Sequence, residues 1–145
     1  MAHDSISEIS ILENLKRFHF WVGVIGIIIF LMTGQYMYHW HAHLEGMADG
    51  PRMLFRSAHI YFLLASVINL VVGFYLTPKS LQHRKYTQII ISILVLLAPV
   101  LVLIGFFVEP HLSELSRPYS TFGMYALFAV AILIIVIEIK NMLRR

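Results

Sequence analysis

The chain has 145 residues, of which 59% are hydrophobic and 13% charged, and its mean hydropathy is +0.76. A soluble domain carries about a quarter charged residues, so this composition excludes a soluble or disordered protein and indicates one that resides in a bilayer. The absence of cysteine excludes disulfides, thiolate metal sites, iron–sulfur clusters and haem thioether attachment. The net charge of +3 does not point to nucleic acid, because the basic residues cluster beside apolar runs, where they determine membrane topology.

A short interfacial helix is expected over residues 5–15, ahead of the first apolar run. Ser5 with Glu8 and Ser10 with Glu13 each fit the capping box that begins a helix. The acidic residues of this segment, and an apolar run longer than the core of a signal peptide, argue against cleavage. We therefore expect the first apolar run to remain in the mature protein.

Four apolar stretches, at about 18–38, 57–76, 86–108 and 119–137, are long enough to cross a bilayer. A helix needs about 20 residues to cross a hydrocarbon core of about 30 Å, and only a helix satisfies its own backbone groups there. The connections are short, so neighbouring helices are expected to be antiparallel. The sequence predicts an all-α membrane protein in which residues 1–145 form a single antiparallel four-transmembrane-helix bundle.

The lysines and arginines near the span ends predict the orientation of the bundle. Eight of them flank the spans on the side that carries both termini, and three, Arg52, Arg56 and Arg117, lie on the other side. Because cytoplasmic segments retain positive charge during insertion, both termini are expected in the cytoplasm. The chain is thus predicted to be a multi-pass protein of a bacterial inner (cytoplasmic) membrane.

Five of the eight histidines gather at the predicted outer end of the bundle, and four of them, His39, His41, His43 and His111, lie in or beside the outer connections. A helical connection would place His39 and His43 on one face, whereas an extended one would align His39, His41 and His43. Imidazole with nearby carboxylate suits a transition metal such as Cu or Zn. A solvated cluster without metal is the alternative.

The second span carries polar and small residues on one face of an otherwise apolar helix. They recur at steps of four, three, seven and seven, with Asn69 at the edge of the stripe: Arg52, Arg56, His59, Ser66 and Gly73. Such residues let helices approach closely and form interhelical hydrogen bonds, so Ser66, Asn69 and Gly73 are expected to serve packing.

Arg56 and His59 need a different explanation, because ionisable groups inside a span are costly. A carboxylate across the outer face is one expected partner of Arg56, with Glu45, Asp49 and Glu109 as candidates. A bound ligand is the other.

A ligand at this position is expected to be a b-type haem or a quinone headgroup. His59 would ligate haem iron, Arg56 and Arg52 would hold the propionates, and His39 or His111 could supply the second axial ligand. A quinone headgroup hydrogen-bonded by His59 is also compatible with these residues. The inner histidines, His19 and His83, lie beside basic residues and are expected to contact lipid phosphate.

Four apolar helices with histidines near their ends resemble, in outline, the membrane cytochromes b and the anchor subunits of respiratory complexes. The resemblance covers the helix count and the available histidines, with no family motif matched. No motif of a hydrolase or kinase occurs. Three hypotheses follow: a haem- or quinone-associated redox protein, an outer-face metal binder, and a non-catalytic membrane subunit or assembly factor of a larger complex. A homo-oligomer is a further expected form of the chain.

Overall fold

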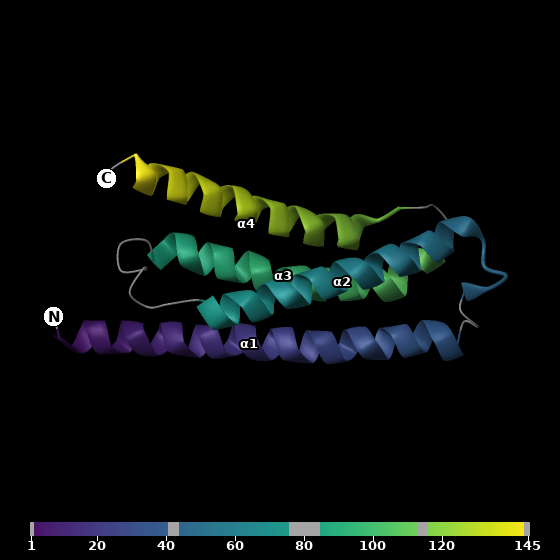
Figure 1. Cartoon of the computed structure of the whole chain (residues 1–145), viewed down its shortest axis with the longest axis horizontal. Helices are drawn as coiled ribbons and strands as arrows, with labels where there is room; N and C mark the ends of the chain where they lie inside the picture. The colour runs from purple at the N-terminus through teal and green to yellow at the C-terminus, as the bar shows by residue number, and fades with distance from the viewer. Residues whose placement is uncertain (1, 41–43, 76–84, 113–115, 144–145) are drawn as a thin grey trace.

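A computed structural model of the chain describes residues 2–40, 44–75, 85–112 and 116–143 (Figure 1). Side chains are described for the same residues except 2–12, 85, 86, 138 and 141. The described part contains four α-helices and one short 3₁₀ helix and no strand, which confirms the all-α prediction. These elements are α1 (Ala2–His39), α2 (Asp49–Tyr75), α3 (Lys85–Val108), η3 (Glu109–His111) and α4 (Pro118–Met142).

Each of the four helices contains a stretch long and apolar enough to cross a membrane. The stretches are Glu13–His39, Asp49–Tyr75, Thr87–His111 and Pro118–Ile137, one for each predicted span. The chain is therefore a multi-pass membrane protein in its architecture, with apolar helices suited to contact with the lipid bilayer.

Two helix boundaries differ from the sequence predictions. The expected interfacial helix over 5–15 is not a separate element, because α1 runs without a break from Ala2 to His39. No glycine or proline precedes Gly23 to interrupt it. Helix α2 begins at Asp49, well before the predicted residue 57, with the carboxylate of Asp49 in its first turn and Pro51 close behind. Both residues favour the start of a helix.

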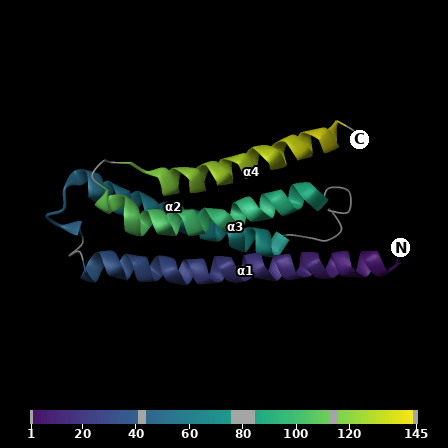
Figure 2. The same cartoon turned by 180° about the vertical axis from the view of Figure 1, so that it is seen from behind.

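The helices form a layer with α2 and α3 in the middle and α1 and α4 on the two flanks (Figures 1 and 2). Helix α1 packs mainly against α2, and α4 packs mainly against α3. Both chain ends lie at one end of the layer, which we call the inner end (Figure 1). The opposite end, which carries His39 and the starts of α2 and α4, is called the outer end.

Helices α1 and α2 touch through their backbones toward the inner end. A Cβ atom on Gly23 would lie 2.6 Å from the backbone nitrogen of Leu70, and one on Gly73 would lie 2.6 Å from that of Phe20. Neither position accepts a side chain without a shift of the backbone. Toward the outer end the two helices diverge, as Figure 1 shows.

Side chains from the connection and from α3 fill the gap left by this divergence. Leu44 is 2% exposed and has a φ of 63°, in the left-handed region of backbone space. It packs with Phe55 and Ala58 of α2 and Phe106 of α3. This outer cluster supports the cavity described next.

Candidate functional site

His59 is half-buried between α2 and α1, and its hydrogen bond defines which ring nitrogen carries a proton. Its Nδ1 lies 3.0 Å from Oγ1 of Thr33. The Thr33 hydroxyl donates its only proton to the carbonyl oxygen of Phe30, at 2.9 Å. Oγ1 therefore accepts from Nδ1–H, and a neutral His59 has its lone pair on Nε2. The ring of Phe30 stacks on the imidazole with centroids 4.0 Å apart, which fixes its plane.

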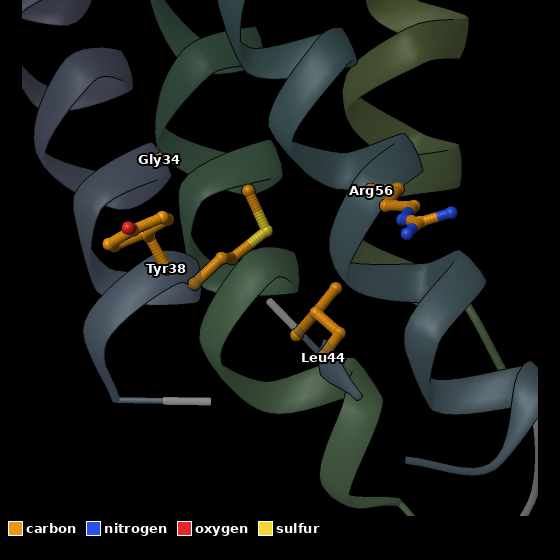
Figure 3. Close-up of a pocket in the computed structure, with 5 residues that line it drawn as sticks. Gly34, Tyr38, Leu44 and Arg56 are labelled. Atoms are coloured by element: carbon orange, nitrogen blue, oxygen red, sulfur yellow. The ribbon is translucent and has the colours of Figure 1, made fainter. Parts of the chain in front are cut away.

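A cavity of about 220 Å³ lies between the outer ends of α1 and α2. His59 does not line it, but Gly34, which faces His59, does. It is lined by Gly34, Met37, Tyr38, Leu44 and Arg56. Figure 3 shows Tyr38 on α1 and Arg56 on α2 at opposite sides, with Leu44 between the helices and the guanidinium of Arg56 extending away from Tyr38. Tyr38 and Arg56 are both exposed, so the cavity is open to the surroundings of the bundle.

Gly34 connects His59 to this cavity. A Cβ atom on Gly34 would lie 3.5 Å from Cε1 and 3.7 Å from Nε2 of His59. The Nε2 edge of the imidazole thus faces Gly34, which has no side chain and forms part of the cavity wall.

The cavity is small for haem. Pockets for drug-sized ligands and cofactors enclose about 300–1,000 Å³, so this volume suits one six-membered ring better than a porphyrin. Arg52, expected to hold a propionate, forms an ion pair with Asp49 instead. The assignment of His59, Arg56 and Arg52 to a haem remains a prediction.

Arg56 has none of its expected carboxylate partners among the described residues. Asp49 binds Arg52, and Glu45 forms no ion pair there. Glu109 is 1% exposed and accepts hydrogen bonds from the backbone nitrogen of Ser120, at 2.8 Å, and from its hydroxyl, at 2.6 Å. It thereby caps the N-terminus of α4.

The outer histidines remain a prediction as metal ligands. His39 is exposed and contacts the ring edge of Tyr38, whereas the exposed His111 contacts the ring of Phe55. His41 and His43 lie outside the described residues. Within the described ranges, no three His, Asp or Glu side chains are close enough together to hold a metal ion.

His19 is placed differently from its prediction. It is 0% exposed, and its Nδ1 lies 2.9 Å from Oδ1 of Asn69. The Asn69 amide nitrogen donates to the carbonyl oxygens of Ala65 and Val95, so one polar bridge joins α1, α2 and α3. The expected contact of His19 with lipid phosphate is therefore wrong, because this side of α1 faces α2. Nε2 of His19 has no hydrogen-bond partner among the described residues, and His83 lies outside them.

The packing prediction for the second span is confirmed, because Ser66, Asn69 and Gly73 are all buried. The outer part of the same stripe behaves differently, since His59 is half-buried and Arg56 is exposed. Sequence reasoning missed Thr33 and Gly34, which face His59 from another helix. A hydroxyl and a glycine side by side in an apolar run were the available signal.

Comparisons with protein-family models, with curated proteins and with solved structures found no match to this chain.

Proposed function

We propose that this chain is a small membrane protein that binds the headgroup of a lipid-soluble quinone at the outer end of α1 and α2. The observation that carries the proposal is the Nε2 lone pair of His59 next to Gly34, which lines a ring-sized cavity open to the surroundings of the bundle. A quinone headgroup is one six-membered ring with two opposed oxygen atoms. In the reduced headgroup, one hydroxyl would donate to Nε2, and the exposed guanidinium of Arg56 would turn to donate to the other oxygen.

The surroundings of the cavity suit a ligand with an apolar tail. Leu31 lies one turn before Gly34 on α1 and is 61% exposed, and Ile60 lies one turn after Arg56 on α2 and is 60% exposed. Both side chains lie toward the middle of the span from the cavity. An isoprenoid tail would lie along them in the bilayer while the headgroup occupies the cavity.

We further propose an antiparallel bundle in a bacterial inner membrane, with both termini cytoplasmic. The location of both chain ends at one end of the layer and the excess of basic residues there support this topology. The natural absence of cysteine makes a clean test available. A membrane-impermeant maleimide applied to intact cells should label Glu45→Cys and leave Lys79→Cys unlabelled until the membrane is opened. The reverse pattern would contradict the orientation.

The quinone site is tested by binding to purified protein in detergent. A short-chain benzoquinone is titrated in its oxidised and reduced forms, and the dissociation constant is measured by calorimetry. His59→Leu should weaken binding of the reduced form about tenfold, because one hydrogen bond is lost in a partly desolvated site. His39→Leu, which changes an exposed histidine at the same end, should leave the affinity unchanged. Equal affinity of His59→Leu and the parent protein would overturn the proposal.

Separate measurements test the remaining hypotheses. An absorption spectrum of protein produced with ample haem, oxidised and then reduced, tests the haem hypothesis, and elemental analysis tests for Cu or Zn at His39, His41, His43 and His111. Light scattering in detergent tests whether the chain forms a homo-oligomer, and co-purification tests whether it is a subunit of a larger complex.

A further inference from the structure

We infer that the His59 site selects the reduced, hydroxyl-bearing hydroquinone over the oxidised quinone. This inference rests on the proposed function and makes it more specific. It comes from the number of protons available to the hydrogen-bonding groups around His59, not from the size or shape of the cavity.

The Thr33 hydroxyl determines what the imidazole can offer a ligand. That hydroxyl has one proton, and the Phe30 carbonyl takes it. Thr33 can then only accept from His59, so Nδ1 is the protonated nitrogen and Nε2 is an acceptor. The tautomer is thereby held by the backbone of α1, through one threonine.

The groups packed around the ring contain nothing that would keep it charged. Phe30, Thr33 and Gly34 face it from α1, and Phe106 faces it from α3 at a centroid distance of 6.4 Å. Among the described residues, no carboxylate forms an ion pair with His59. The neutral ring with an accepting Nε2 is the form that a ligand meets.

A quinone and a hydroquinone differ in how they meet this acceptor. The carbonyl oxygen of a quinone only accepts hydrogen bonds, so its lone pairs would oppose that of Nε2. A hydroquinone hydroxyl donates its proton to Nε2, and its second oxygen can still accept from Arg56. A site arranged to bond a hydroxyl disfavours the analogue that lacks it. Because the cavity is partly open to its surroundings, we expect a preference of about tenfold, which is the scale of one net hydrogen bond.

The experiment compares one ring in two redox states on the intact protein. Tetramethyl-1,4-benzoquinone and its hydroquinone are titrated separately into detergent-purified protein, the hydroquinone under argon with excess reductant. The hydroquinone should bind about tenfold more tightly. Equal affinities, or tighter binding of the quinone, would overturn this inference and leave the quinone site standing. Binding of neither form would overturn the proposed function and this inference with it.

Two variants of Thr33 test the cause. Thr33→Val removes the acceptor for Nδ1–H at nearly constant volume, so the imidazole can adopt the other tautomer and donate from Nε2. The preference for hydroquinone should then fall to about twofold or less. Thr33→Ser keeps the hydroxyl and should keep the preference. A full preference in a folded Thr33→Val protein would overturn the inference, and if that variant does not fold, the parent comparison still decides it.

Discussion

Substitution of Gly34 by alanine should weaken ligand binding while leaving the fold intact. The added Cβ atom would lie 3.5 Å from Cε1 and 3.7 Å from Nε2 of His59. These are ordinary van der Waals distances, so no backbone shift is needed. On the proposed route past Gly34, however, the same methyl group would stand between a ligand oxygen in the cavity and Nε2.

Gly34→Ala should leave the free energy of unfolding unchanged or raise it, and should lower the affinity for the ligand. Alanine favours a helix over glycine by about 1 kcal/mol, so the free energy of unfolding of Gly34→Ala should be unchanged or slightly higher. Its affinity for the short-chain hydroquinone should fall at least tenfold, because the hydrogen bond to Nε2 is blocked.

Thermal unfolding in detergent, followed by helical circular dichroism, measures the first quantity, and calorimetric titration measures the second. A Gly34→Ala protein that binds as tightly as the parent would refute the reasoning, since the ligand would then not pass Gly34. A marked fall in the melting temperature would refute the packing distances on which the argument depends.

Three further substitutions test the helix contacts through the same unfolding assay. Gly73→Ala should lower the free energy of unfolding by about 1–3 kcal/mol, because its Cβ meets backbone at 2.6 Å. Glu109→Gln should cost about 1–2 kcal/mol by removing the charge that caps α4, whereas Glu45→Gln, at an exposed site, should cost nothing measurable. Asn69→Leu should cost about 1–3 kcal/mol by leaving the buried Nδ1–H of His19 without an acceptor, and adding His19→Leu should recover part of that loss. Equal stability of the single and double variants would contradict the last interpretation.

The number of helices followed from the sequence because length and hydropathy alone decide whether a segment spans a bilayer. The side of α1 that carries His19 did not follow, since basic neighbours suggested lipid phosphate while the backbone contact at Gly23 turns that side toward α2. The rotation of a helix about its axis depends on the helix it packs against, so the sequence of one helix alone does not determine that rotation.

The candidate site, too, could be predicted from the sequence only in part. His59 could be identified from sequence because an ionisable residue in a span requires a reason. Its partner Thr33 could not, because 26 positions separate the two residues and only the packing of α1 on α2 brings them to 3.0 Å. The cavity depends in addition on Leu44, whose left-handed backbone conformation carries the connection back between the helices.

The contact of α1 with α2 near the inner end acts as the fulcrum of a lever. Gly23 lies 11 residues from Gly34, which at 1.5 Å per residue gives an arm of about 16 Å. A change of about 5° in the angle between the helices would then move the cavity walls by about 1.4 Å. Because bilayer thickness alters helix tilt, we expect the affinity for hydroquinone to change when the protein is reconstituted in lipids of different acyl-chain length. An affinity independent of acyl-chain length would contradict this pivoting motion. It would indicate that Leu44 and Phe106 hold the angle between α1 and α2 fixed.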